Sequence, residues 1–220
     1  MREVDTIIVG QGLAGSSLAY ELMALGQKVV VIDRNDEGSS SRVAAGLITP
    51  LTGKGMNPAW RQEEYLAKAI KHYQEIELKS DQRCYFPQPV LRVFSSEKEE
   101  RKWASKEGSQ NRWAKVEEVI PEAIVSDNHA IKMNDGAWVD TISFLSIIKD
   151  LLINEDSFLE EDFLEKDVVF NEDKVTWNNI SARKIILCQG AYGLAKEGGG
   201  VLVQLCSASQ RKRGNTYSEN

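Results

Sequence analysis

The segment at residues 10–15, Gly-Gln-Gly-Leu-Ala-Gly, constrains the fold more than any other part of this chain. It follows an apolar, β-branched run at residues 4–9, which is typical of a buried strand. After it, residues 13–25 carry apolar side chains at helical spacing, and a second apolar run ends at Asp33. A strand, a glycine-rich turn, a helix and a second strand in this order predict a parallel β-α-β unit with a right-handed crossover.

The three glycines of this segment have separate tasks in such a unit. Gly10 permits the tight turn, Gly12 lets the backbone approach a pyrophosphate, and Gly15 allows the helix to pack closely on the strand. The phosphates then lie against the helix N-terminus, where free N–H groups and the helix dipole stabilise negative charge. Asp33 lies 23 residues after Gly10, where a carboxylate accepts hydrogen bonds from ribose hydroxyls. The sequence therefore predicts a dinucleotide site, and Asp33 disfavours the 2′-phosphate of NADP, an exclusion that the adjacent Arg34 weakens.

The segment at residues 39–55 bears on which dinucleotide is bound. It is long and rich in small residues, whereas an NAD-binding fold would begin another helix soon after its second strand. Such a segment could lie flat against a large planar ligand, or it could be an ordinary surface loop, and composition favours neither interpretation. The residues alone therefore leave NAD and FAD open.

Four segments occur in an order that carries more information than any one of them. They are the glycine fingerprint with its flanking strand and helix at 7–19, Ser-Arg-Val-Ala-Ala-Gly-Leu at 41–47, Asp-Gly-Ala-Trp-Val-Asp at 135–140, and an apolar strand with a glycine turn at 182–191. Together they resemble the D-amino-acid oxidase and glycine oxidase family of FAD-dependent enzymes. The resemblance covers residues 4–193.

This resemblance implies an α/β fold, in which a Rossmann-like FAD-binding domain is joined to part of a second substrate domain built on an antiparallel sheet. The FAD-binding domain would be discontinuous, formed by residues 1–80 and 155–195, and the partial substrate domain would be 81–154. Residues 196–220 are polar and basic without a clear period, so we expect a disordered or non-native tail. Relatives of this kind continue far beyond the equivalent of Gly193, and a frameshift near Lys196 is one hypothesis for the difference.

The resemblance also implies FAD as the cofactor and gives its contacts. Asp33 would hold the adenosine ribose, Val168 would contact the adenine through its backbone, and Gly190 would approach the cofactor. Arg42 and the residues at 44–47 would line the flavin. The full set of expected cofactor-binding residues is Gly10, Gly12, Leu13, Ala14, Gly15, Asp33, Arg34, Arg42, Ala44, Ala45, Gly46, Leu47, Val168 and Gly190.

Enzymes of this kind oxidise an amine or amino acid by hydride transfer to the flavin, so the cofactor carries the chemistry and the catalytic residues stay unassigned. Arg61 and Arg92 could anchor a substrate carboxylate through a bidentate fork, although a solvated surface arginine is the more ordinary interpretation of each. Two alternatives remain. One is a non-catalytic nucleotide-binding remnant or truncated product, and the other is an NAD-dependent dehydrogenase. The substrate and the electron acceptor stay open.

Composition argues against several other classes of protein. The formal net charge of -6 disfavours binding to nucleic-acid backbones. The two histidines, His72 and His129, have no cysteine or carboxylate partners at ligand spacing, so we expect no metal site. Three scattered cysteines indicate a reducing compartment, and Cys188 is expected to be a core residue rather than a nucleophile. No run reaches the ~20 apolar residues of a membrane span, so we expect a cytoplasmic protein with a small-molecule partner, whose oligomeric state stays open.

Overall fold

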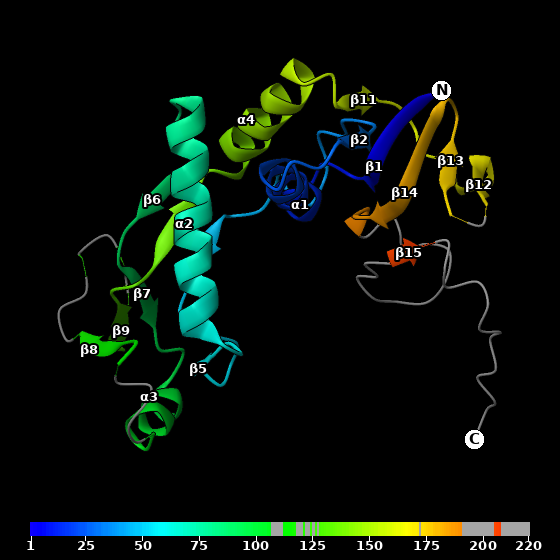
Figure 1. Ribbon diagram of the computed structural model, residues 1–220. Coiled ribbons are helices and arrows are strands. Elements are labelled where there is room, and N and C mark those ends of the chain that lie inside the picture. Colours follow the sequence, from blue (N-terminus) through cyan, green and yellow to red (C-terminus); the bar gives the residue numbers. More distant parts are fainter. Residues whose placement is uncertain are drawn as a thin grey trace, which may run out of the picture. The chain divides into compact units, whose positions relative to one another are not determined.

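The chain folds into two compact units (Figure 1). The computed structural model describes residues 1–106, 112–117, 121, 124, 126, 128–171, 173–190 and 205–207. The first unit comprises Met1–Ala44 and Thr141–Asn220, and the second comprises Ala45–Asp140.

The unit boundaries differ from those expected at residues 80 and 155. The segment after Ala44 belongs to the second unit because β3 (Leu47–Ile48) pairs with β10 (Ala137–Val139). Conversely, α4 (Thr141–Asn154) belongs to the first unit because it packs against α1 (Leu13–Ala24). Both contacts join residues that are far apart in sequence, and no local pattern announces them.

The first unit is built on one sheet whose central strands are parallel, and its strand order is β11-β2-β1-β14-β13-β12. β1, β2, β11 and β14 are parallel, whereas β13 and β15 pair antiparallel with β14, and β12 pairs antiparallel with β13. The strands are β1 (Arg2–Val9), β2 (Val29–Asp33), β11 (Phe158–Glu160), β12 (Val168–Phe170), β13 (Val175–Trp177), β14 (Ile180–Leu187) and β15 (Leu205–Ser207), with a 3-10 turn at Glu165–Asp167. The expected α/β class with a Rossmann-like parallel sheet is confirmed.

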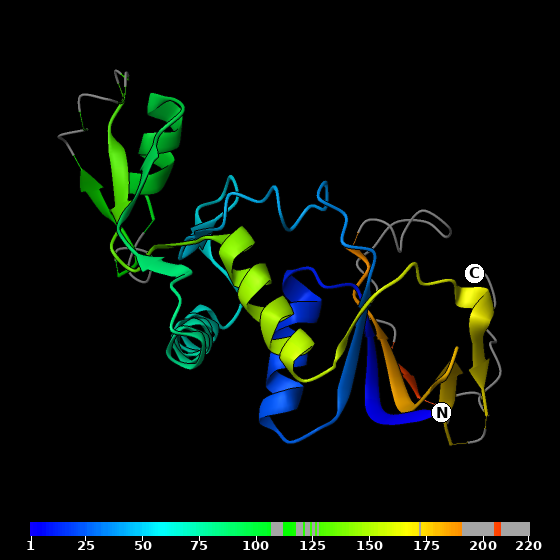
Figure 2. The same cartoon turned by 90° about the horizontal axis from the view of Figure 1, so that it is seen from above.

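The core of this unit follows from its apolar strands. Ile7 and Ile32 are fully buried within a cluster that also contains Trp177, as expected for parallel strands that are covered on both faces. Figure 2 shows α1 and α4 side by side on one face of the sheet. Gln11, only 5% exposed, joins the two helices because its side-chain amide donates to Leu145 O at 2.8 Å and to Ser16 Oγ at 3.0 Å.

Among its described residues, the second unit contains three small antiparallel sheets, with strand orders β3-β10-β6, β7-β9-β8 and β4-β5. Its remaining elements are β4 (Leu51–Thr52), β5 (Asn57–Pro58), α2 (Gln62–Ser80), β6 (Tyr85–Pro87), β7 (Val90–Val93), α3 (Glu97–Ala104), β8 (Lys115–Glu117) and β9 (Ala130–Met133). These antiparallel sheets match the expected second, antiparallel-sheet part of the fold.

The turn at 134–136 does not join its flanking strands into a hairpin, because β9 pairs with β7 and β8 whereas β10 pairs with β3 and β6. The strand is also interrupted between β6 and β7, at residues 88–89. Gln88 N, in this interruption, donates a hydrogen bond to Gly136 O, in the turn between β9 and β10, at 3.1 Å. A Cβ on Gly136 would lie 2.6 Å from Val90 Cγ2. Gly136 therefore lets the β6–β7 and β9–β10 connections pack closely against each other. Both connections lead from one sheet to the other.

Helix α2 is fixed to its sheet by an aromatic contact and a carboxylate. Tyr73 stacks on Tyr85 with ring centroids 5.6 Å apart and an interplanar angle of 5°. Glu77 Oε1 accepts hydrogen bonds from the backbone N–H groups of Cys84 at 2.7 Å and Tyr85 at 2.8 Å. The helix begins at Gln62, directly after Arg61, whose left-handed backbone (φ 51°) prevents an earlier start.

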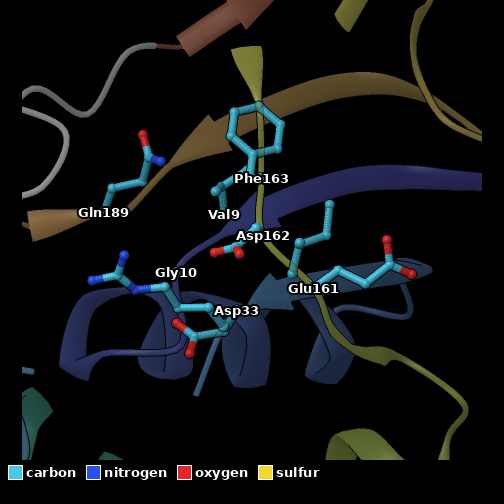
Figure 3. A pocket seen from close by; sticks show the side chains of 9 residues that line it. Val9, Gly10, Asp33, Glu161, Asp162, Phe163 and Gln189 are labelled. Carbon is cyan, nitrogen blue, oxygen red and sulfur yellow. The ribbon is translucent and has the colours of Figure 1, made fainter. Parts of the chain in front are cut away.

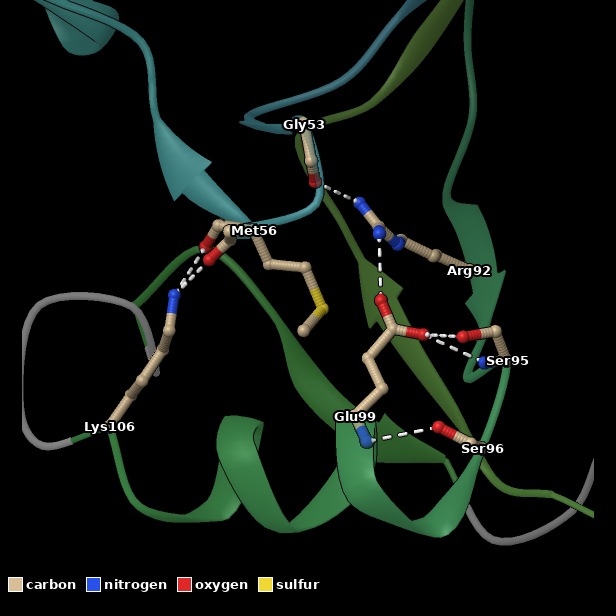
Figure 4. Close-up of polar contacts among 8 residues, drawn as sticks. Gly53, Met56, Arg92, Ser95, Ser96, Glu99 and Lys106 are labelled. Atoms are coloured by element: carbon tan, nitrogen blue, oxygen red, sulfur yellow. Dashed lines mark hydrogen bonds and ion pairs between the residues drawn. The ribbon is translucent and has the colours of Figure 1, made fainter.

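A polar network ties α3 to the loop at residues 53–56, between β4 and β5 (Figure 4). Arg92 donates to Gly53 O at 2.8 Å and to Glu99 Oε1 at 2.9 Å. The second oxygen of Glu99 accepts from both the N–H and the hydroxyl of Ser95, each at 2.7 Å. Lys106 donates to the carbonyl oxygens of Gly55 and Met56. One carboxylate and two cations thus hold a loop that has no regular structure of its own.

We expect Glu99→Gln to lower the free energy of unfolding of the second unit by about 1–2 kcal/mol at neutral pH, because a charge-assisted network loses its acceptor. The backbone N–H of Ser95, then its hydroxyl and Arg92, lower the pKa of Glu99. The carboxylate therefore stabilises the fold above about pH 4.5, and this stabilisation is lost as the pH falls through the folded-state pKa. Urea unfolding at pH 7 and pH 3 should show a difference from wild type that shrinks in acid. Glu97→Gln, at an 83% exposed side chain, is the control and should have almost no effect.

Candidate functional site

The turn from β1 into α1 is too crowded for any side chain at two of its glycines. A Cβ on Gly15 would lie 1.8 Å from Gly10 O, and a Cβ on Gly10 would lie 2.4 Å from Cys188 O. Gly10 also has a φ of 102°, which L side chains rarely adopt. Its N–H donates to Ile32 O at 2.8 Å, so the turn is held to β2 as well as to the end of β14. The strand ends and the helix start are therefore packed backbone to backbone.

The N-terminus of α1 has no acidic cap. Gly12 is the N-cap residue, no side chain caps it from this position, and the first turn, which starts with Leu13 and Ala14, contains no acidic residue. Ser41 reaches the same place from the loop after β2, and its hydroxyl accepts from Leu13 N at 3.1 Å. The helix end thus presents N–H groups and a hydroxyl, which together favour a phosphate.

Asp33, at the end of β2, is held in one orientation by two backbone donors. Its Oδ2 accepts from Gln11 N at 2.7 Å and its Oδ1 accepts from Asn35 N at 2.6 Å. A carboxylate oxygen can accept a further hydrogen bond, so both oxygens keep capacity for ligand hydroxyls. The glycine turn and the acidic residue are therefore one rigid arrangement rather than two independent features.

A cavity of about 120 Å³ opens beside Asp33, at the carboxyl ends of β1, β2 and β11 (Figure 3). Figure 3 shows the side chain of Asp162 directed toward the Gly10 turn, whereas that of Glu161 points away from it. The residues that line the cavity are Val9, Gly10, Ile32, Asp33, Arg34, Glu161, Asp162, Phe163 and Gln189. In open α/β sheets, ligands bind outside the carboxyl ends of the strands where the strand order reverses, and here β1 is that point.

The loop at residues 39–43 approaches the same helix end from the other side. A Cβ on Gly190, which has a φ of 56°, would lie 4.0 Å from Ser40 Oγ. Arg42 donates to Asn35 Oδ1 at 2.9 Å, and Arg34 forms an ion pair with Asp36 at 2.7 Å. The two arginines are therefore anchored beside the end of β2.

Comparison with known proteins decides what kind of site this is. The sequence model described as FAD dependent oxidoreductase matches residues 5–210 of this chain. The chain belongs to this family. Among curated protein sequences, the uncharacterized oxidoreductase YurR of Bacillus subtilis is 42% identical over 67 residues, which are 30% of this chain and 17% of YurR.

Solved structures of amino-acid and imino-acid oxidising enzymes share the fold of this family member. Iminodiacetate oxidase from Chelativorans sp. BNC1 matches with a TM-score of 0.68 and 21% identity, over 86% of this chain and 56% of that enzyme. Glycine oxidase from Geobacillus kaustophilus matches with a TM-score of 0.64 and 12% identity, over 88% and 57%. L-amino acid deaminase from Proteus myxofaciens, solved in complex with anthranilate, matches with a TM-score of 0.60 and 14% identity, over 87% of this chain and 46% of that enzyme. The chain spans about half the length of these enzymes.

The FAD-dependent family gives the cofactor, and the first unit fits it. The end of α1, which has no acidic residue in its first turn, suits a pyrophosphate, and Gly10 and Gly15 leave no space for side chains at the turn beneath it. Asp33 is oriented at a cavity large enough for part of an adenosine. An oxidoreductase of this family needs these features for binding, independently of its substrate.

Val168 and the residues at 44–47 are not among those that line the described cavity. Val168 starts β12 and pairs with Trp177, and its side chain packs against the apolar core, so the expected contact with the adenine would come from its backbone. Phe163 also lines the cavity. Ala44 ends the first unit, and the next three residues, Ala45, Gly46 and Leu47, belong to the second. Sequence reasoning also overlooked Gln11, Ser41 and Asp162. Ser41 opens the segment at 41–47 that carries the family resemblance, whereas the sequence marks Asp162 only by its place after a short strand.

Other reactive groups of this family member are engaged or inert. Arg61 pairs with Glu64, and Arg92 is held in the loop network, so neither guanidinium is open as a bidentate carboxylate anchor. Burial, then the charges of Glu77 and Asp140, raise the pKa of the Cys84 thiol to about 12. Burial also raises the pKa of Cys188. Within the described ranges, no His, Cys, Asp and Glu cluster could hold a metal ion, and no helix there is long and apolar enough to cross a membrane.

Proposed function

We propose that this chain takes part in the oxidation of an amine or amino acid by hydride transfer to FAD. The observation that carries the proposal is the convergence of the α1 N-terminus, the Ser41 hydroxyl and the oriented carboxylate of Asp33 at the carboxyl edge of the sheet. The names of the structural relatives, which are oxidases and deaminases of amino and imino acids, support the substrate class. We place the protein in the cytoplasm, as its three scattered cysteines suggest.

Each group of residues then has a definite task. The first unit holds the cofactor and the second contributes to the substrate side. Gly10, Gly12 and Gly15 bring the backbone to the pyrophosphate, and Asp33 accepts hydrogen bonds from the adenosine ribose. Gly190 approaches from the end of β14, and Arg42 with residues 44–47 lines the flavin. Bound FAD supplies the acceptor for the hydride of the amine carbon.

A flavin titration tests this proposal. Purified chain is mixed with FAD, separated from free ligand, and its absorbance spectrum is recorded, with thermal unfolding measured in parallel. We expect a bound flavin spectrum and a rise in unfolding temperature with FAD but not with NAD. Protection by NAD and none by FAD would indicate the dehydrogenase alternative. Dye reduction with a panel of amines and amino acids then separates an active enzyme from a nucleotide-binding chain without turnover.

The acidic lining of the cavity leads to a prediction about ligand charge. Asp33 and Asp162 both face the space beside the turn, so a 2′-phosphate there would meet two carboxylates. We expect calorimetry to show tighter binding of ADP than of adenosine 2′,5′-bisphosphate, and Asp162→Asn to narrow this preference about fivefold. Glu161→Gln removes a charge whose side chain points away from the turn, and it should leave the preference nearly unchanged. An equal effect of the two variants would contradict the placement of Asp162.

A further inference from the structure

A row of exposed side chains crosses one face of the β3-β10-β6 sheet in the second unit. Trp138 on β10 lies opposite Leu47 on one side and Phe86 on the other, so the three side chains share a face. Trp138 and Phe86 stack with ring centroids 5.0 Å apart. Leu47 is 57% exposed and Trp138 37% exposed. Together with Arg83, these residues are called the Arg83 row below.

The opposite face of the same sheet is already used for packing. Ala137, Val139 and Tyr85 alternate with the row and are almost completely buried. Tyr85 stacks on Tyr73 of α2. An antiparallel sheet commonly packs one face on the core and solvates the other with polar side chains. Here the outer face carries a tryptophan, a phenylalanine and a leucine instead.

Arg83 gives this apolar face a charged end. Its guanidinium carbon lies 4.9 Å from the centroid of the Phe86 ring, so the cation rests on the aromatic row. Among the described residues no carboxylate pairs with Arg83. Arg112 provides a contrast in the same unit, since it lies 5.1 Å from the Trp113 ring and is bound by both oxygens of Glu63.

We propose that the Arg83 row binds a small carboxylate with a planar, apolar body. The guanidinium edge matches a carboxylate in charge and geometry, and the ring edges of the stacked Phe86 and Trp138 offer an apolar surface to an aromatic body. The inference rests on the proposed function, because it narrows the substrate to aromatic or similarly apolar amino acids. All four residues belong to one unit, so the surface exists without FAD.

Calorimetric titration of the whole chain with anthranilate, in the absence of FAD, tests this inference. We expect saturable binding to the wild type, no binding of aniline, which lacks the carboxylate, and about fivefold weaker binding to Arg83→Gln. Arg112→Gln is the matched control. It also removes a guanidinium that lies over an aromatic ring, but this guanidinium is already paired with Glu63 of the same chain, so the variant should bind anthranilate like the wild type. Arg83→Lys keeps the charge without the planar fork and should be intermediate.

Equal binding to the wild type and to Arg83→Gln would overturn the inference, and so would equal affinity for aniline and anthranilate. The row could instead join two copies of the chain. If Trp138→Gln converts a sedimenting dimer into monomer and anthranilate does not bind, that interface replaces the proposal. Because the titration contains no flavin, a failed FAD titration with intact anthranilate binding would refute only the proposed function.

Discussion

Replacing Gly15 by alanine is expected to abolish FAD binding and to lower the free energy of unfolding of the first unit by about 3 kcal/mol or more. The added methyl group would lie 1.8 Å from Gly10 O, a backbone atom that cannot rotate away as a side chain would. Gly10 cannot retreat either, because it already packs against the carbonyl of Cys188 and its N–H is bound to Ile32 O. The helix must therefore move off the strand, and its N-terminus moves with it.

This result would oppose the ordinary trend, since alanine in a helix is favoured over glycine by about 1 kcal/mol. Gly38→Ala is a suitable control, because its only close neighbour would be the Asp36 side chain at 3.4 Å, and it should be nearly neutral. Urea unfolding and retention of FAD on a desalting column measure the two effects. A Gly15→Ala variant that keeps flavin at wild-type affinity would show that the phosphates do not lie against α1.

The sequence was sufficient for the parts of the site that depend on local spacing. Gly10 and Gly15 lie in one turn, and Asp33 lies at the end of the next strand, so a fixed offset along the chain reports their proximity. The two strands and the helix of the β-α-β unit follow in the same way from the spacing of apolar residues and from the β-branched composition of the strands. The parallel centre of the sheet was predictable for that reason.

The remainder depends on contacts between distant segments. Asp162 and Phe163 join the cavity because β11 adds to the sheet beside β2, and no spacing between residues 33 and 162 records that pairing. The unit boundary at Ala44 likewise depends on the pairing of Leu47 with Trp138. The hairpin of β12 with β13, which directs the Val168 side chain to the core and would leave its backbone for the adenine, also depends on tertiary packing. Long-range strand pairings therefore position the peripheral residues of the site, such as Asp162, whereas local sequence patterns position the glycine turn and Asp33.

Asp33→Asn is the variant expected to separate the adenosine end of the site from its flavin end. The carboxylate accepts one backbone N–H with each oxygen, from Gln11 and from Asn35. An amide can accept with only one of its two atoms, so one N–H loses its acceptor, at a cost of about 1–3 kcal/mol. The ribose hydroxyls lose a charged acceptor as well, and we expect FAD to bind about 10- to 100-fold more weakly.

FMN provides the discriminating measurement, because it carries the flavin and one phosphate but no adenosine. If Asp33 acts on the ribose, Asp33→Asn should weaken FAD and ADP strongly while FMN changes little. A parallel loss for all three ligands would mean that the variant disturbs the turn itself and that the carboxylate is structural. Asp36→Asn controls for charge, since Asp36 is bound to Arg34 and to the N–H of Gly38 and lines no part of the described cavity. The ratio of FAD to FMN affinity therefore reports directly on the link between the acidic end of β2 and the cofactor.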